Sequence, residues 1–217
     1  MTGGQIVKRL ALALAAAGCL AIAPARAQQG VMAPDVLARN VTDEVLALLR
    51  ADKEIQSGNL GKVVDLVDKK VLPHFDFTRM TQLAAARYWQ QASPDQQKIL
   101  VHEFRSLLVQ TYAATFAAYR DQKVEYRPLR AEPADTEVVV KSLIHQSGAK
   151  PVTVDYKMRK SDAGWKVYDV VVGDLSLVQS YRGTFSSEVQ RGGVDGLIKA
   201  LAEKNRQLNA EPQAARK

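Results

Sequence analysis

Cysteine and histidine are scarce in this chain of 217 residues, which contains one cysteine, Cys19, and three histidines. None of the histidines, His74, His102 and His145, has a second histidine or a cysteine at the spacing of metal ligands. With a single thiol the chain cannot form an internal disulfide, and a cysteine-based metal site is excluded. We therefore expect neither a metal ion nor another cofactor.

Recognisable catalytic and nucleotide-binding motifs are also missing. Gly61-Lys62 lacks the earlier glycine and the following serine or threonine of a phosphate-binding loop, and no serine stands in a Gly-x-Ser-x-Gly pattern. No basic run interleaved with aromatic residues indicates a nucleic-acid partner. The sequence therefore predicts that the protein is not an enzyme. Asp169 is the one candidate acid or base, and capping of backbone groups or pairing with an arginine is its favoured interpretation.

The first residues have the pattern of a secretory signal peptide. Lys8 and Arg9 precede an uncharged apolar run over residues 10–23, which is too short to span a membrane. Ala25-Arg26-Ala27 then supplies the small residues that signal peptidase requires. We therefore expect a signal peptide over residues 1–27, a mature chain that begins at Gln28, and export from the cytoplasm.

A lipoprotein signal at Cys19 is the alternative reading of this leader. Ala16 stands where such a signal normally has leucine, and the chain stays apolar after the cysteine, so cleavage after residue 27 is favoured. That cleavage removes the only thiol, which suits an oxidising compartment. It also removes three basic residues and no acid, so the net charge falls from +7 to about +4. A mildly basic chain of this kind indicates an ordinary solvated surface.

Apolar periodicity predicts an α+β fold, mostly helical, with helices packed on one face of a twisted four-stranded antiparallel sheet. The expected helices cover residues 34–49, 63–71, 80–89, 93–120, 177–191 and 193–208, and the expected strands 123–127, 137–145, 152–159 and 165–172. Leu37, Val41, Val45, Leu48 and Leu49 form the apolar stripe of the first helix. We expect a single domain over residues 28–208 and a flexible polar tail over 209–217.

Several segments together resemble the MlaC family, also called the toluene-tolerance auxiliary family. They are Val71-Leu72-Pro73, Tyr88-Trp89, the capped helix start Ser93-Pro94-Asp95-Gln96 with Thr111-Tyr112-Ala113, and the strand, turn and helices from Trp165 to Leu201. The resemblance implies a fold related to the NTF2-like cone. It also implies a periplasmic carrier that shuttles phospholipid between the outer and inner membranes and maintains the lipid asymmetry of the outer membrane.

The resemblance further implies partners and a cargo. The carrier is expected to be a monomer that docks transiently on an inner-membrane ring of MCE-domain subunits with its ATP-driven transporter, and on an outer-membrane lipoprotein–porin complex. Phospholipid is the cargo rather than a cofactor. Nothing in the residues themselves identifies either partner.

Tyrosines recur on the inward-facing stripes, and their polar tips suit a site that is apolar inside and wet at its mouth. Together with the resemblance, they predict a deep pocket between sheet and helices that takes both acyl tails and leaves the head group outside. The residues expected to line it are Val71, Leu83, Phe104, Leu108, Tyr112, Phe116, Val140, Val154, Tyr156, Val170 and Tyr181. Two alternatives stay open: a cone-fold enzyme that uses Asp169, and a periplasmic interaction or chaperone module with a solid core.

Overall fold

The computed structural model describes residues 31–118, 122–132, 134–146 and 148–210. The predicted signal peptide with Cys19, and most of the predicted tail, lie outside these residues. Within the described ranges, none of the helices combines the length and the apolar character that a membrane span needs.

The chain before the sheet is helical. It forms α1 (Pro34–Ala51), α2 (Lys53–Gln56), α3 (Leu60–Lys70), the 3-10 turn η1 (Leu72–His74), α4 (Phe77–Ala85), the 3-10 turn η2 (Ala86–Gln91) and α5 (Pro94–Ala117). The predicted capping box of α5 is confirmed: Ser93 Oγ accepts from the Gln96 amide at 3.2 Å, and the Ser93 amide donates to Gln96 Oε1 at 2.9 Å. Helix α3 ends just before Pro73, which has no amide hydrogen to continue it.

The sheet is antiparallel throughout, in the order β1-β2-β3-β4-β5. Its strands are β1 (Lys123–Tyr126), β2 (Glu137–His145), β3 (Val152–Ser161), β4 (Gly164–Val172) and β5 (Leu175–Ser176). The prediction of four strands missed β5, because two residues are too few to show an alternating pattern. Gly173 makes the tight turn before β5 at φ 60°, a backbone region that favours glycine.

A β-bulge in β4 changes which side chains face the helices. Lys157 of β3 pairs with Asp169, but its neighbour Met158 pairs with Val167, so Tyr168 is an extra residue without a β3 partner. The residues on either side of the bulge therefore do not follow one uninterrupted alternation. Val167 and Val170 face the helices, and the side chain of Asp169 is turned to the opposite face of the sheet.

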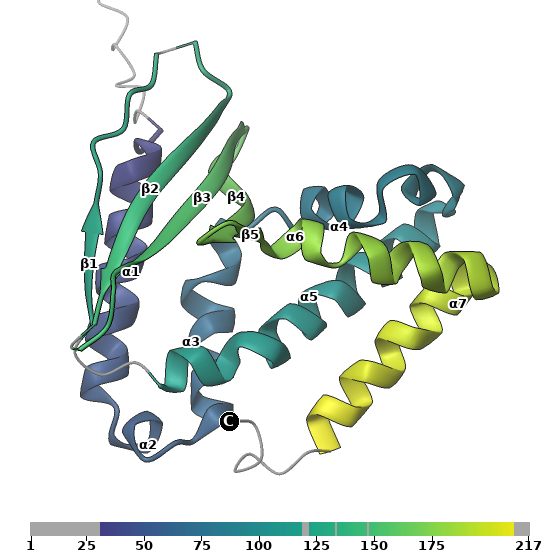
Figure 1. The fold of residues 1–217 in the computed structure, drawn as a ribbon, viewed down its shortest axis with the longest axis horizontal. Coiled ribbons are helices and arrows are strands. Elements are labelled where there is room, and N and C mark those ends of the chain that lie inside the picture. Colours follow the sequence, from purple (N-terminus) through teal and green to yellow (C-terminus); the bar gives the residue numbers. More distant parts are fainter. Residues whose placement is uncertain (1–30, 119–121, 133, 147, 211–217) are drawn as a thin grey trace, which may run out of the picture. The chain divides into compact units, whose positions relative to one another are not determined.

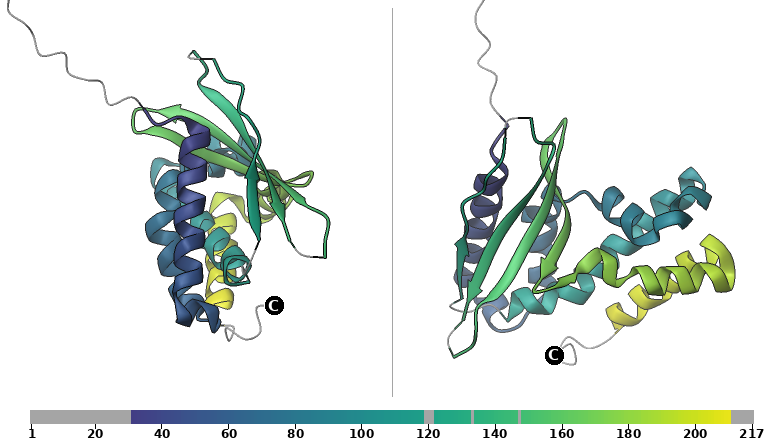
Figure 2. Two further views of the ribbon diagram at one scale, coloured as in Figure 1. Left: turned by 90° about the vertical axis from the view of Figure 1, so that its left-hand side faces the viewer. Right: turned by 45° about the horizontal axis from the view of Figure 1, so that its top comes forward.

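Helices α6 (Leu177–Ser180) and α7 (Arg182–Ala210) close the described chain. The predicted break at the double glycine is confirmed: Gly192 and Gly193 leave helical geometry, and Gly193 has φ 67°. Figure 1 shows α1 running behind β1 and β2, whereas α5, α6 and α7 continue past the β5 edge, as the second view in Figure 2 also shows. Buried apolar residues form three clusters, one centred on α1–α3, one under the sheet and one among α4–α7.

Candidate functional site

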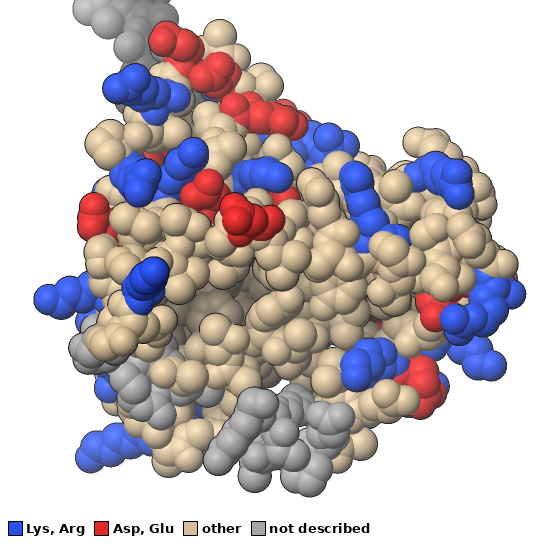
Figure 3. Space-filling model, viewed as in Figure 1, with Lys and Arg blue, Asp and Glu red and all other residues tan. Residues whose placement is uncertain are grey.

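A cavity of about 370 Å³ lies between the sheet and helices α1, α3, α4 and α5. Among the residues that the structure describes, none of the lining side chains is an acid, a lysine or an arginine, and only Thr42, His74, Tyr112, Thr115 and Tyr156 bring a polar side-chain atom to the cavity. Figure 3 shows a hollow in the uncharged surface between the sheet and α5. A concave, apolar site with a few polar atoms is the usual form of a site for an apolar ligand.

Regular periodicity places the wall residues. On α5, Leu108, Tyr112 and Phe116 recur at spacings of four, so they lie above one another on the face turned to the sheet. On β3, Val154 and Tyr156 alternate with polar residues and point to the same side. Helix α1 forms a third wall with residues spaced three or four apart, as on α5. Strand β4 forms the fourth, where the bulge allows Val167 and Val170 both to face the cavity.

The hydroxyls of the wall residues Thr42 and Tyr156 belong to a group that also includes Tyr126 and Ser142, which are outside the cavity lining. Thr42 Oγ1 lies 2.6 Å from Tyr126 Oη, and the Tyr126 hydroxyl donates to the Ala38 carbonyl at 3.1 Å. Ser142 donates to the Val154 carbonyl at 2.9 Å. Burial raises the pKa of Tyr156, and hydrogen bonds with Ser142, Tyr126 and Thr42 oppose this effect. The hydroxyls therefore stay neutral and partnered, and they put no charge against the cavity.

His74 is the one titratable base among the wall residues in the described part of the chain. Burial is the main cause that lowers its pKa from the ordinary value of 6.5, the positive charge of Lys166 adds to the effect, and Glu44 opposes it. The imidazole is therefore neutral at neutral pH. Among the described residues, no group of three or more His, Cys, Asp or Glu side chains is placed to hold a metal ion.

Comparison with known proteins agrees with this geometry. Residues 39–203 match the family model described as MlaC protein. The chain belongs to the MlaC family. A solved relative, a phospholipid-binding protein from Ralstonia solanacearum in complex with a phospholipid, is 44% identical, covers 81% of this chain and 98% of its own, and superposes with a TM-score of 0.75.

Two curated proteins are more distant relatives. The toluene tolerance protein ttg2D of Pseudomonas putida is 24% identical over 163 residues, which are 75% of each chain. The intermembrane phospholipid transport system binding protein MlaC of Haemophilus influenzae is 21% identical over 173 residues, which are 78% of this chain and 81% of that protein. The MlaC-family match therefore extends over most of the described residues.

The cavity brings together most of the residues expected to line a pocket in this MlaC-family chain. Those on its wall are Val71, Leu108, Tyr112, Phe116, Val154, Tyr156 and Val170. They come from α3's C-terminal end, α5, β3 and β4, and the shared feature is an apolar stripe that faces the gap between sheet and helices. Their contact with lipid stays a prediction.

The other expected residues, Leu83, Phe104, Val140 and Tyr181, are outside the cavity lining. Phe104 is fully buried between Tyr181 and Phe185, with both ring centroids 5.1 Å away. Leu83 packs on the same helical cluster, and Val140 is fully buried in the cluster under the sheet. Periodicity identifies a buried face but not what covers it, which is why these positions were grouped with the wall.

Helix α1 contributes wall residues that the sequence did not single out as site residues. Leu37, Val41 and Val45 line the cavity, whereas Leu48, which the predicted stripe also contained, is exposed at 38%. The amphipathic stripe was the available signal. It placed α1 against the core, but only the packing of α1 beside the sheet makes this face part of the site.

Asp169, the candidate acid or base, is turned away from the cavity. It is 2% exposed, and its carboxylate accepts from Lys157 Nζ at 3.0 Å, from Ser176 Oγ at 2.8 Å and from the Val178 amide at 3.3 Å. The favoured interpretation of this residue holds in outline: it caps a backbone amide and pairs with a base, which is a lysine rather than an arginine.

Proposed function

We propose that this chain is a periplasmic carrier that holds the acyl tails of a phospholipid in the apolar cavity and shuttles the lipid between the inner and outer membranes. The observation that carries the proposal is the cavity wall, whose described residues include no acid, lysine or arginine. A related chain, 44% identical, was solved in complex with a phospholipid. We propose further that this shuttling maintains the lipid asymmetry of the outer membrane.

The physical need for such a carrier follows from the cost of wetting lipid tails. Two acyl chains contain about thirty methylenes, and exposing them to water costs on the order of 25 kcal/mol at about 0.8 kcal/mol each. Unassisted passage through an aqueous compartment is therefore very slow. An apolar cavity cancels most of this cost, because the tails leave one apolar phase for another.

Direction must then come from the docking partners, since transfer between two apolar phases has a free energy near zero. The partners we propose are an inner-membrane MCE-domain ring with its ATP-driven transporter and an outer-membrane lipoprotein–porin complex, visited by a monomeric carrier. Support comes from membership of the MlaC family and from the name of the H. influenzae relative, which refers to an intermembrane phospholipid transport system.

The cavity must widen to accept a whole lipid. Its volume of about 370 Å³ lies near the lower end of the range of about 300–1,000 Å³ for pockets that bury a drug-sized ligand. Two acyl tails are larger than such a ligand. We therefore expect the walls to part when both tails enter.

The direct test is to purify the protein from cells and to identify extracted lipid by mass spectrometry. Phospholipid should co-purify, and the emptied protein should take up labelled phospholipid from vesicles. Leu108→Arg and Val154→Arg, which put a charge on the wall, should each reduce uptake by at least tenfold, since a charge in an apolar site must be desolvated. Val139→Arg, at a position 39% exposed on the outer face of β2, is the matched control.

A lipid-free extract together with no uptake from vesicles would overturn the proposal. Unchanged uptake by folded Leu108→Arg and Val154→Arg proteins would show that lipid binds somewhere else. The cavity also disfavours the alternative of an interaction module, whose expected mark is a solid core.

A further inference from the structure

Residues 173–178 form a rim segment at an opening of the cavity. The segment connects two wall residues, Val172 and Leu177. Val172 is nevertheless 40% exposed, and Leu175, at the tip of the turn, is 59% exposed. A residue that both lines a cavity and contacts solvent marks an opening, so any lipid that passes here must pass beside this segment.

Few backbone contacts attach the rim segment to the sheet. Strand β5 pairs with β4 only through Val171 with Ser176 and Val172 with Leu175. One further hydrogen bond runs from the Gly173 amide to the Thr153 carbonyl at 2.9 Å. A two-residue edge strand of this kind contributes little stability by itself.

The carboxylate of Asp169 holds the segment from the face of the sheet opposite the cavity, and the side chain of Val178, 1% exposed, is buried in the cluster among α4–α7. One oxygen accepts from Ser176 Oγ at 2.8 Å and the other from the Val178 amide at 3.3 Å. Lys157 Nζ lies 3.0 Å from the same oxygen as Ser176. The carboxylate thus joins β3 and β4 to β5 and to the first turn of α6.

Because the Asp169 carboxylate is buried, it depends on these particular hydrogen-bond donors. A carboxylate that is 2% exposed is stable only while its donors stay in place. If the whole rim segment moves outward, Ser176 and Val178 both leave the carboxylate, Lys157 alone remains, and the side chain of Val178 leaves the cluster among α4–α7. Moving the rim therefore breaks two charge-assisted hydrogen bonds, which are stronger than bonds between neutral groups.

We infer that Asp169 is a positioning residue that latches the rim segment and so sets the rate at which lipid enters and leaves the cavity. The inference rests on the proposed carrier function. It assigns the buried carboxylate to control of the opening, because Asp169 does not touch the cavity and its two contacts hold the segment between the wall residue Val172, which is partly exposed, and α6.

The test measures transfer of a fluorescent phosphatidylethanolamine between vesicles and the protein by stopped flow. Asp169→Asn keeps the shape of the side chain but removes its charge and one acceptor, so both rim contacts weaken. Transfer should become about tenfold faster in both directions, the change that weakening a charged hydrogen bond produces when it must break in the slow step. Equilibrium occupancy should stay within about twofold, because the cavity wall is unchanged.

Two controls separate the latch from general loosening. Asp155→Asn changes a half-buried carboxylate on the same outer face, opposite Lys141 of β2, and should transfer lipid at the native rate. Gly193→Ala strains the α7 kink at φ 67° and lowers stability without touching the rim segment, so it should also leave the transfer rate unchanged.

Ser176→Ala is the second test variant, and it carries the test alone if Asp169→Asn does not fold. It removes one of the two rim contacts, together with the acceptor of the Gln179 amide at the start of α6, and should accelerate transfer less than Asp169→Asn. Amide exchange at Val178 should rise in both variants, since its hydrogen bond to Asp169 is weakened directly or through loss of its neighbour.

Each outcome decides between the two ideas. If the native protein carries lipid and both folded variants transfer it at the native rate, the latch is wrong and the carrier function stands. If transfer accelerates equally in Gly193→Ala, general loosening explains the rate and the latch is wrong. If the native protein carries no lipid at all, the carrier function fails, and the latch fails with it.

Discussion

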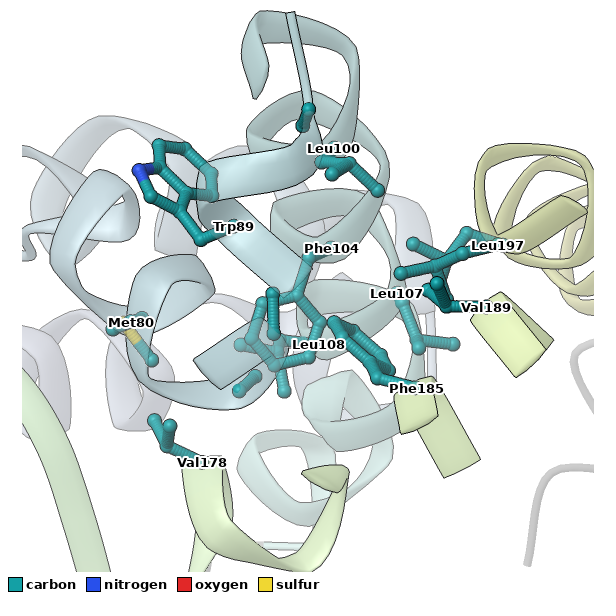
Figure 4. Packing of buried hydrophobic residues seen from close by; sticks show 14 residues of the cluster. Met80, Trp89, Leu100, Phe104, Leu107, Leu108, Val178, Phe185, Val189 and Leu197 are labelled. Carbon is teal, nitrogen blue, oxygen red and sulfur yellow. The ribbon is translucent and has the colours of Figure 1, made fainter. Parts of the chain in front are cut away.

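The two ends of α5 show how similar apolar residues build either a filled core or a hollow. In its first half, Phe104 packs against Phe185 and Tyr181 among α4–α7, and Figure 4 shows Phe104, Phe185, Leu107 and Leu197 meeting there. In its second half, the corresponding face of the helix lines the cavity under the sheet. The difference lies in the partner: a helix can approach closely, whereas a twisted sheet diverges from a straight helix.

The largest expected difference between the two regions comes from removing an aromatic ring from each. Phe104→Ala should lower the free energy of unfolding by about 3–5 kcal/mol, because the ring is fully buried and its loss leaves a void. Phe116→Ala should cost only about 1–2 kcal/mol, because this half-buried ring already borders empty space. Urea unfolding of the lipid-free proteins measures both. Equal losses would mean that the two regions are packed alike.

Enlarging an alanine should have opposite consequences in the two regions. Ala84→Leu, in the helical cluster, should cost about 1–3 kcal/mol through overpacking, since this alanine is 1% exposed. Ala113→Leu projects into the cavity and should change stability by less than about 1 kcal/mol while it reduces the lipid that the protein can hold. Urea unfolding and lipid uptake check the pair. A large loss of stability in Ala113→Leu would show that the hollow is already filled.

The smallest effect is a pH dependence that belongs only to the hollow region. Burial lowers the pKa of His74 in the folded state, so the unfolded chain takes up a proton first as the pH falls. The contribution of His74 to stability is therefore complete above its ordinary pKa of 6.5 and is lost progressively below it. Lipid affinity should weaken at lower pH than this, where the folded protein itself takes up the proton at its lowered pKa, because protonation then puts a charge on the wall. His74→Gln should flatten this part of both pH profiles, and unchanged profiles would contradict the assignment.

The sequence predicted the regular elements well because their signals are local. Alternation over β2 and β3, the capping box at Ser93 and the double-glycine break at Gly192 each depend on residues a few positions apart. Strand β5 and the bulge at Tyr168 were missed, because a two-residue strand and an unpaired residue leave no periodic trace. The bulge matters most, because it places Val170 on the cavity face of the sheet and Asp169 on the opposite face, where Asp169 contacts the rim segment.

The assignment of wall residues was limited for the same reason. Periodicity marked Leu108 and Phe104 equally, as buried positions on one apolar helix, but Leu108 borders the cavity as well as the helical cluster, whereas Phe104 lies in the cluster alone. The sequence could not make this distinction, because it depends on which element lies opposite each turn of α5.

From its sequence alone, this protein has a helix-rich α+β fold, an antiparallel sheet with one apolar face and no motif for nucleotide or thiol chemistry, because these follow from residue identity and short-range spacing. Only the tertiary structure decided where the apolar faces meet and where they stay apart. That decision depends on the twist of the sheet, the bulge in β4 and the position of α1 beside the strands, which together leave about 370 Å³ open beside a helix whose other end is packed solid.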